Sequence, residues 1–319
     1  MSQSLPVVTV VIAARPGQAE VRSVAASQAL DYPREKLEII VARGKQPAIQ
    51  RNRAVEAATG ELIYFLDDDS IPPTDNLKRG VAHFTDAKVC LLGGPNLCPP
   101  DAPPIEHAFA ATMGTWLAFG PSRARYAAVG AVRESSEKEL ILCNLLARRE
   151  AFLKAGGFDE ALYPNEENAL MDALQAAGGK LLYDPAFYVH RRPRPNISAF
   201  VKMLMTYGRG RAEQFRRHPT LGSAPNFVPP LFCVYLVALF AGPLLPPWVW
   251  WPLLAYLAVL LLQAVAATAR KTSVARLAFL IFLSHVCYGT GFWKGLLTKF
   301  KSREEQAAVS VDLEKVQTV

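Results

Sequence analysis

Three adjacent carboxylates, Asp67, Asp68 and Asp69, follow the apolar residues 62–66 and are placed to do chemistry. A short apolar run bounded by glycine and proline is typical of a buried strand of the parallel type. In an open α/β sheet, ligands bind beyond the carboxyl ends of the strands. Three carboxylates there repel one another unless a cation neutralises them. Their hard oxygens favour Mg²⁺ or Mn²⁺, which substrate phosphates help to bind. The alternative is an acidic turn that only precedes the next helix.

A second acidic group, Glu166 and Glu167, starts a predicted helix over residues 166–177 that Asn165 can cap. One carboxylate beside a substrate hydroxyl can act as a general base, which is worth roughly 10²–10⁴-fold in rate. Helical neighbours point about 100° apart, so only one of the two can face a site. The alternative is a pair of acids stabilised by the dipole at a helix N-terminus.

The elements that would position these acids alternate along the first part of the chain. Strands are predicted over residues 7–14, 37–42, 62–66 and 88–92, and helices over residues 20–30, 47–58 and 74–84. This alternation predicts right-handed βαβ units and an α/β fold with a mostly parallel, Rossmann-like sheet. Residues 99–139 read as a long irregular segment, which in a compact domain is usually functional or disordered. Residues 180–189 are predicted to form an edge strand.

The net charge of +7 in 319 residues comes from one place in the sequence. Between His190 and His218 the only acid is Glu213, and the basic residues are Arg191, Arg192, Arg194, Lys202, Arg209, Arg211, Arg216 and Arg217. Such a basic surface suits nucleic acid or anionic lipid headgroups. Its spacing predicts an amphipathic helix at a membrane interface.

The next stretch favours the membrane over nucleic acid. No Asp, Glu, Lys or Arg lies between Arg217 and Arg270. Residues 227–245 and 248–267 are each about long enough to cross a hydrocarbon core of ~30 Å. An uncharged turn over residues 242–247 separates them, and tryptophans at the start of the second arm suit an interfacial aromatic belt. We therefore predict a membrane helical hairpin, the alternative being two buried helices of a soluble protein.

A third apolar segment, residues 277–293, has basic residues on both sides. Positive charge at both ends conflicts with the positive-inside rule for a spanning helix. An in-plane or re-entrant helix is therefore favoured, with a true span kept open. Residues 7–14 lack a basic region before them, so we expect no secretory signal and a first domain that stays in the cytosol. The five cysteines have no CxxC spacing, which argues against a zinc site or a disulfide framework.

These patterns predict four regions. They are a cytosolic catalytic domain over residues 1–195, a basic interfacial segment over 196–225, membrane helices over 226–300, and a polar cytosolic tail over 301–319.

Seven short motifs in a fixed order carry a resemblance to a known family. They are Gln50-Arg51-Asn52, Phe65-Leu66-Asp67-Asp68-Asp69, Gly93-Gly94-Pro95-Asn96, Gly156-Gly157-Phe158-Asp159-Glu160, Asn165-Glu166-Glu167, Tyr183-Asp184-Pro185 and Tyr207-Gly208-Arg209-Gly210-Arg211. Over residues 7–217 the chain resembles inverting family 2 glycosyltransferases of the GT-A fold. The nearest subgroup is the membrane-attached bacterial one typified by succinoglycan-chain glycosyltransferases.

The resemblance implies roles for residues of this chain. A nucleotide-diphosphate sugar would lie on Ala14, Arg15, Glu20, Arg51, Asn52, Asp67 and Asp68. Asp69, with Asp67, would hold the Mg²⁺ or Mn²⁺ ion, and Glu167 would be the base, with Glu166 in reserve. The acceptor or its lipid phosphate would meet Asn96, Arg191, Arg192, Arg194, Arg209 and Arg211. For Arg51 the alternative is a solvated helix face, and for the arginines it is ordinary attraction to anionic headgroups.

The chain departs from the family pattern in two places. Many relatives carry an acidic turn after the second strand, with an Asp for the base, where this chain has Ala42-Arg43-Gly44-Lys45. The identity of the nucleotide is therefore open. The base motif is usually Glu-Asp, and here it is Glu166-Glu167, whose second side chain is one methylene longer.

The expected function is a metal-dependent inverting transfer of one hexose to a lipid-linked (polyprenyl) saccharide. The reaction would take place at the cytosolic face of the inner membrane, during exopolysaccharide or surface-glycan assembly. The Gln-x-x-Arg-Trp signature of processive synthases is matched only in part by Gln214-Phe215-Arg216-Arg217-His218, which predicts one sugar per encounter. Nucleic acid is not expected as a partner. The alternatives are a polyprenyl-phosphate glycosyltransferase and a catalytically silent membrane scaffold with the same fold.

Overall fold

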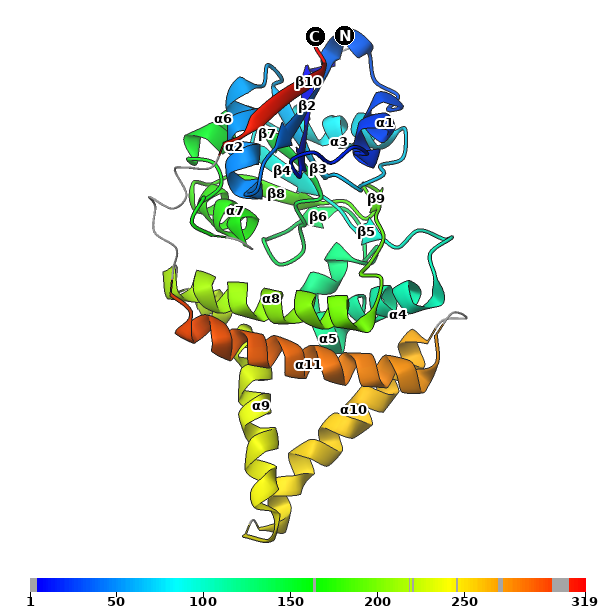
Figure 1. Ribbon diagram of the computed structural model, residues 1–319, viewed down its shortest axis with the longest axis vertical. Coiled ribbons are helices and arrows are strands. Elements are labelled where there is room, and N and C mark those ends of the chain that lie inside the picture. Colours follow the sequence, from blue (N-terminus) through cyan, green and yellow to red (C-terminus); the bar gives the residue numbers. More distant parts are fainter. Residues whose placement is uncertain are drawn as a thin grey trace. The chain divides into compact units, whose positions relative to one another are not determined.

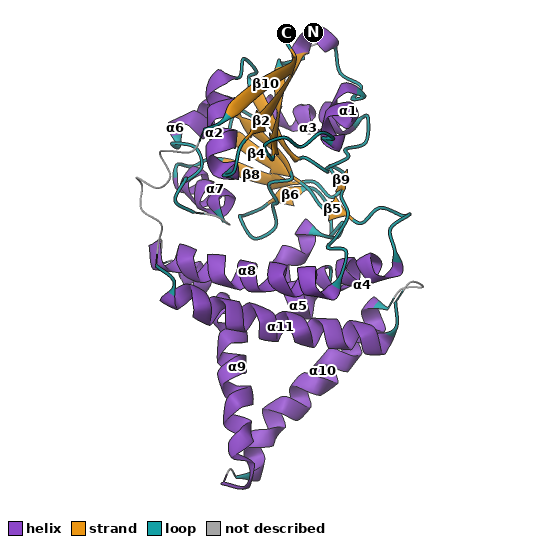
Figure 2. Cartoon of the chain, viewed as in Figure 1, coloured by secondary structure: helices purple, strands orange, loops and turns teal. Residues whose placement is uncertain are grey.

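The computed structural model describes residues 5–162, 165–217, 219, 221–244, 246–268, 272–299 and 310–319 (Figures 1 and 2). The described residues form two compact units. The first comprises Met1–Pro99, Ala124–Arg191 and Lys301–Val319, and the second comprises Pro100–Arg123 and Arg192–Phe300.

The first unit is built on an eight-stranded sheet with the strand order β10-β2-β1-β3-β7-β4-β8-β6. Its strands are β1 (Val8–Ala14), β2 (Leu37–Arg43), β3 (Leu62–Asp67), β4 (Val89–Gly93), β6 (Arg133–Glu134), β7 (Asn144–Arg148), β8 (Lys180–Tyr183) and β10 (Asp312–Gln317). A separate pair joins β5 (Asn96–Leu97) and β9 (Val189–His190). The helices are α1 (Arg22–Gln28), α2 (Pro47–Ala57), α3 (Asn76–Ala82), α6 (Arg149–Lys154) and α7 (Glu166–Ala176), with short 3₁₀ turns at Arg34–Lys36 and His83–Thr85.

Strand β3 is buried on both faces. Successive side chains of a strand point to opposite faces of the sheet. In β3, Ile63 and Phe65 enter one apolar cluster, which contains residues of α2, α6 and α7. Leu62, Tyr64 and Leu66 enter the other, which contains residues of α3. A strand buried on both sides reads as a continuous apolar run, and this is why residues 62–66 were recognisable in the sequence.

The expected α/β fold is confirmed, but the sheet as a whole is mixed. Strands β2, β1 and β3 run parallel, as do β4 and β8. Strand β7 lies antiparallel between β3 and β4. The edge strand expected over residues 180–189 is instead flanked on both sides, since β8 pairs with β4 and β6.

Strand β10 corrects the expectation of a polar tail. Residues 301–309 of that tail lie outside the described residues, and the residues after them add an antiparallel strand to β2. In the sequence Asp312-Leu313-Glu314-Lys315 only Leu313 is apolar, and it packs against the cluster on the α2 face. An edge strand with one solvated face needs few apolar side chains, so a tail and a strand look alike in the sequence.

The second unit is helical. It holds α4 (Pro104–Met113), α5 (Trp116–Phe119), α8 (Ile197–Arg217), α9 (Val228–Ala238), α10 (Trp251–Ala267) and α11 (Val274–Leu297), with 3₁₀ turns at Leu221–Phe227, Leu239–Leu244 and Pro247–Trp250. A further turn, Gly120–Arg125, crosses the boundary between the units. Helices α4 and α5 lie in the stretch expected to be irregular, and Pro104 at the first position of α4 starts a helix there.

Helices α8 and α11 run side by side at very short range (Figure 1). A Cβ on Gly208 would lie 2.0 Å from the carbonyl oxygen of Tyr288, and one on Gly291 would lie 2.1 Å from that of Met205. Only glycine permits this approach. The basic helix α8 therefore packs against an apolar partner of the same unit.

Three helical segments are long and apolar enough to cross a membrane by length and composition. They are Gly222–Gly242, Pro247–Ala267 and Val274–Leu297. The first two extend away from the α8–α11 pair and meet at their far ends (Figure 2). They correspond to the predicted hairpin, of which Leu245 lies outside the described residues. The third segment is more buried than the other two.

Candidate active site

The acidic motif stands at the carboxyl end of β3 and is fixed from two sides. Asp67 is the last residue of the strand, and the amide of Ser70 donates to its carbonyl over 3.1 Å. Ile71 and His190 exchange two backbone hydrogen bonds of 2.9 and 2.8 Å. This bridge sets the residue after β9, Arg191, beside the acids.

Two arginines neutralise these carboxylates. Arg51 Nη2 lies 2.8 Å from Asp67 Oδ1, and Arg191 Nη1 lies 3.2 Å from Asp67 Oδ2. Arg191 Nε also donates to Asp69 Oδ1. Burial opposes the charge of Arg191, but the charges of Asp67 and Asp69 outweigh it and raise its pKa well above the usual value. The repulsion expected among these acids is therefore balanced by guanidinium groups.

Arg51 also joins the two acidic motifs of the sequence. Its Nη1 lies 3.3 Å from Glu166 Oε1 at the first turn of α7. The side chains of Arg51 and Glu166 are 7% and 3% exposed, so the expected alternative of a solvated helix face does not hold for Arg51. Burial and the charge of Glu167 raise the pKa of Glu166 to about 8, against the opposing effect of Arg51. Glu167 is half-buried.

The two neighbours of Arg51 on α2 each hold another part of the unit. Gln50 Nε2 donates to the carbonyls of Ala14 and Ala42 over 2.8 and 2.6 Å, which ties the ends of β1 and β2 together. Asn52 exchanges hydrogen bonds of 2.9 Å with the backbone N–H and carbonyl of Phe158. Asn52, expected to touch the nucleotide sugar, thus holds the turn before α7. Consecutive helical residues point about 100° apart, so one turn of α2 fastens three separate elements.

The turn that presents Glu166 has an unusual backbone. Asn165 lies at the N-cap position as expected, but it has φ 95° and its side chain makes no capping hydrogen bond. Asparagine tolerates this left-handed region better than other residues with a side chain. Asn168 Nδ2 donates to Asn165 Oδ1 over 2.9 Å, and Arg125 Nη2 donates to Asn168 Oδ1 over 2.6 Å. The sequence reading missed this chain of contacts, whose members are scattered along the sequence.

The predicted nucleobase end lies at the carboxyl ends of β1 and β2. Ala14 is buried and pairs in register with Arg43, while Arg15 and Glu20 are exposed. Gln18, which the sequence reading missed, donates from Nε2 to Asp68 Oδ2 over 2.6 Å. This contact joins the loop after β1 to the acidic motif.

The residues expected to meet the acceptor fall in different places. Asn96 and Arg191 belong to the first unit, where Arg191 contacts Asp67 and Asp69. The remaining four lie in the second unit: Arg192, Arg194, Arg209 and Arg211. Arg192 forms a two-bond fork of 2.8 Å each with the buried carboxylate of Glu106, which is a structural role.

The carboxylates suit a divalent cation as a partial ligand set. Among the described residues, no group of three or more His, Cys, Asp or Glu gathers as a metal cage. Mg²⁺ needs only one or two carboxylates when substrate phosphates complete its shell. Asp69, whose side chain is 42% exposed, fits such a role, whereas both oxygens of Asp67 already contact arginines.

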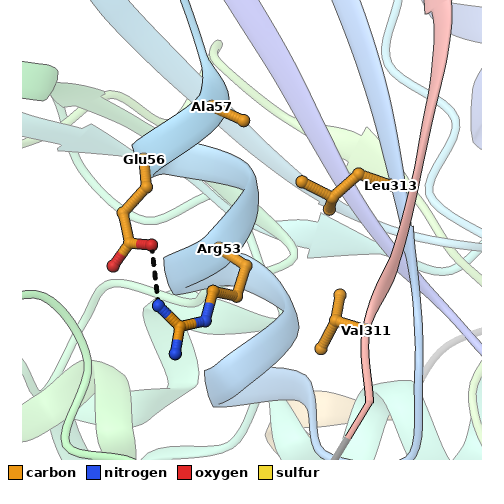
Figure 3. Close-up of a pocket in the computed structure, with 5 residues that line it drawn as sticks. All are labelled: Arg53, Glu56, Ala57, Val311 and Leu313. Atoms are coloured by element: carbon orange, nitrogen blue, oxygen red, sulfur yellow. Dashed lines mark hydrogen bonds and ion pairs between the residues drawn. The ribbon is translucent and has the colours of Figure 1, made fainter.

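A shallow pocket of about 460 Å³ lies elsewhere, between the outer face of α2 and β10 (Figure 3). It is lined by Arg53, Glu56, Ala57, Val311 and Leu313. Arg53 and Glu56 pair with each other at 2.9 Å. None of these residues belongs to the acidic cluster, so the pocket is separate from the candidate active site.

Comparison with known proteins finds glycosyltransferases similar to this chain in sequence and in fold. The family model for glycosyl transferase family 2 matches residues 21–152. A pre-mycofactocin glycosyltransferase of Mycobacterium tuberculosis is 27% identical over 177 residues, which are 55% of this chain and 36% of that protein. The succinoglycan biosynthesis protein ExoA of Rhizobium meliloti (strain 1021) is 27% identical over 198 residues, which are 60% of this chain and 57% of that protein. The chain thus spans little more than a third to just over half of these relatives.

Among solved structures, the mannosyltransferase PcManGT from Pyrobaculum calidifontis has the same fold, with a TM-score of 0.56 at 17% identity. The match covers 92% of this chain and 88% of that one. The resemblance drawn from the seven motifs is confirmed. The chain carries a glycosyltransferase family 2 domain of the GT-A fold.

Proposed function

We propose that this chain is a membrane-attached, metal-dependent, inverting glycosyltransferase. It would move one hexose from a nucleotide-diphosphate sugar to a lipid-linked saccharide at the cytosolic face of the membrane. The observation that carries the proposal is Arg51, which contacts Asp67 at 2.8 Å and Glu166 at 3.3 Å. A single buried side chain therefore brings the strand-end acids and the predicted base motif into one site.

The donor would lie with its diphosphate at the carboxyl end of β3. PcManGT was solved in complex with GDP-Man and Mn²⁺, which supports a nucleotide-sugar donor and a divalent ion for this chain. A divalent ion bound by Asp69 would supply Lewis-acid stabilisation of the departing diphosphate. Arg191, fixed on Asp67 and Asp69, would place a guanidinium where the phosphate charge arrives, and this group suits phosphate oxygens.

Glu167 would act as the base. Its carboxylate would take the proton of the acceptor hydroxyl while that oxygen attacks the anomeric carbon. The bond from this carbon to the diphosphate oxygen breaks, the nucleoside diphosphate leaves, and the configuration inverts. Glu166 is the weaker candidate because its carboxyl group is buried on Arg51. Its contact with Arg51 would instead fix the start of α7.

The acceptor class rests on the second unit and on the relatives. Three segments of this unit are long and apolar enough to cross a membrane, and α8 beside them is basic. The names of the relatives place one in succinoglycan biosynthesis and describe another as a pre-mycofactocin glycosyltransferase. A sugar chain on a polyprenyl carrier would suit both the membrane-length segments and a role in glycan synthesis.

The test is product analysis with membranes that contain the full chain. Labelled nucleotide sugars would be supplied one at a time with Mn²⁺, and lipid extracts would be separated before and after mild acid. Label on a lipid-linked saccharide with an inverted anomeric centre supports the proposal. Label linked directly to a lipid monophosphate would identify a polyprenyl-phosphate glycosyltransferase instead. Incorporation no higher than in membranes that lack the chain, for every donor, would point to a silent scaffold.

A further inference from the structure

The carboxyl ends of three neighbouring strands, β2, β1 and β3, form one edge of the candidate site. In register, Ala13 of β1 pairs with Asp67 of β3, and Ala14 pairs with Arg43 of β2. Adjacent strands lie about 4.8 Å apart, so Arg43 is roughly 10 Å along the edge from the acidic strand. A nucleoside diphosphate with its phosphates at the acids could therefore reach Arg43 with its base. This step rests on the proposed function.

Arg43 is held from two sides. Its Nε and Nη2 both lie 3.0 Å from Glu314 Oε2 of β10, and its Nη1 donates to the carbonyl of Gln18 over 2.8 Å. Gln18 in turn donates to Asp68. A continuous set of contacts thus runs from β10 through Arg43 to the acidic motif.

β10 itself is firmly attached at this place. Lys315 Nζ lies 3.0 Å from Oε1 of the buried Glu38, and Gln317 Nε2 donates to the carbonyl of Leu37 over 2.7 Å. Burial raises the pKa of Glu38, but hydrogen bonds from Thr59 and other neighbours lower it overall, so its carboxylate is maintained. Glu314 is therefore presented to Arg43 by a strand that side-chain contacts hold before and after the register shift between Lys315 and Gln317.

Arg43 can only donate hydrogen bonds, whereas an ionised acid at this position could only accept them. A guanidinium has five N–H donors and no acceptor. Within the described residues, three of these N–H groups face Glu314 and Gln18, which leaves two, and the side chain is 22% exposed. Guanine offers adjacent acceptors at O6 and N7, thymine-like bases offer a carbonyl oxygen, and adenine places a donor beside N7.

We propose that Arg43, positioned by Glu314 of β10, reads the nucleobase of the donor by donating hydrogen bonds to it. Guanine is then the preferred base, uracil is weaker, and adenine is the poorest. Glu314 is a positioning residue, because it orients the plane of the guanidinium and does not touch the base itself.

The first experiment measures binding of GDP, UDP and ADP, each with Mn²⁺, to the purified full chain by calorimetry. One bidentate pair discriminates by about 5- to 150-fold, so GDP should bind tighter than ADP by a factor in this range. Arg43→Lys keeps the charge and loses the planar fork. It should bring the GDP/ADP ratio close to 1 with little change for ADP. Equal binding of GDP and ADP by the wild type, or an unchanged ratio in Arg43→Lys, would overturn the proposal.

The second experiment isolates Glu314. Glu314→Gln should lower the GDP/ADP ratio several-fold with the same melting temperature. Glu150→Gln, the same substitution at an exposed position in the first turn of α6, should leave the ratio unchanged. Equal GDP/ADP ratios in the two variants would show that Glu314 does not influence the base preference. A wild-type chain that binds no nucleoside diphosphate would refute the proposed function. Tight binding without base preference would refute only the role of Arg43.

Discussion

We propose different roles for the adjacent Glu166 and Glu167, one structural and one catalytic, so Gln replacements at each should give opposite results. Glu167→Gln removes the carboxylate that we propose as base and changes the side chain volume very little. General base assistance is worth roughly 10²–10⁴-fold, which corresponds to about 2.7–5.4 kcal/mol of transition-state stabilisation. We expect kcat to fall by this amount, with donor affinity and melting temperature unchanged.

Glu166→Gln should cost far less. Its carboxyl group is 3% exposed, and burial and the charge of Glu167 raise its pKa to about 8. The protonated form of Glu166 is therefore favoured at pH 7. A Gln amide oxygen can accept the same hydrogen bond from Arg51, so the neutral side chain is well imitated. We expect kcat to change by less than about tenfold, because Gln keeps the contact with Arg51 and Glu167 remains as the base.

The assay is steady-state transfer at pH 7 with saturating acceptor, with nucleotide binding and thermal melting measured on the same preparations. A drop in kcat with unchanged binding separates a lost base from lost ground-state contacts. If Glu166→Gln abolished turnover while Glu167→Gln retained it, the assignment of the two residues would be reversed. If both retained turnover, the base would lie elsewhere.

Three further changes follow from the geometry. The raised pKa of Glu166 means that the folded chain binds this proton more tightly than the unfolded chain, so wild-type stability should fall as pH rises between about 4.5 and 8. The melting temperature of Glu166→Gln should therefore fall less than that of the wild type between pH 5 and 8. A steeper fall in the variant would contradict the raised pKa. Asn165→Gly keeps the left-handed turn and should retain most of kcat. Asn165→Val should lower kcat and cost about 1–2 kcal/mol of stability, because valine does not tolerate this backbone conformation. Equal kcat in the two variants would show that the turn does not affect catalysis. Gly208→Ala should lower the melting temperature of the detergent-solubilised chain by overpacking worth about 1–3 kcal/mol, because its Cβ would lie 2.0 Å from a carbonyl of α11. Ser198→Ala, at an exposed position of the same helix, is the control, and matching melting curves would contradict the close helix contact.

The parallel half of the sheet was predictable because its strands are buried on both faces. Residues 7–14, 37–42 and 62–66 were expected as strands, and β1, β2 and β3 begin and end within one residue of these bounds. Each is an apolar run ending at a turn residue, so the signal lies within the strand itself. The start of α7 was predictable for a similar reason, since its acidic first turn marks a helix N-terminus.

Strands that depend on distant partners were harder to recognise. The antiparallel place of β7 between β3 and β4 depends on residues far away in the sequence. β10 carries so few apolar side chains that only its pairing with β2 makes it a strand. Local propensity gives no information about such pairings.

The site residues divide in the same way. Motif order singled out Gln50-Arg51-Asn52, but their partners could not be inferred, since three neighbours on a helix face three different elements. Arg191 was grouped with the arginines expected to meet the acceptor or its lipid phosphate, because it opens a basic stretch of sequence. In the structure, the bridge between Ile71 and His190 sets Arg191 in contact with Asp69. A charged side chain takes its partner from the tertiary fold, which sequence spacing does not encode.

The charge balance of the site changes the reason for expecting a metal ion. From the sequence, a cation seemed necessary to offset three carboxylates. In the structure, Arg51 and Arg191 already face Asp67 and Asp69, and the raised pKa of Glu166 keeps that group largely neutral at pH 7. The two arginines thus offset two of the three strand-end charges, and Asp68, which accepts a hydrogen bond from Gln18, keeps its negative charge. A nucleotide diphosphate brings further negative charge to this place, so most of the demand for a divalent ion arises with the donor.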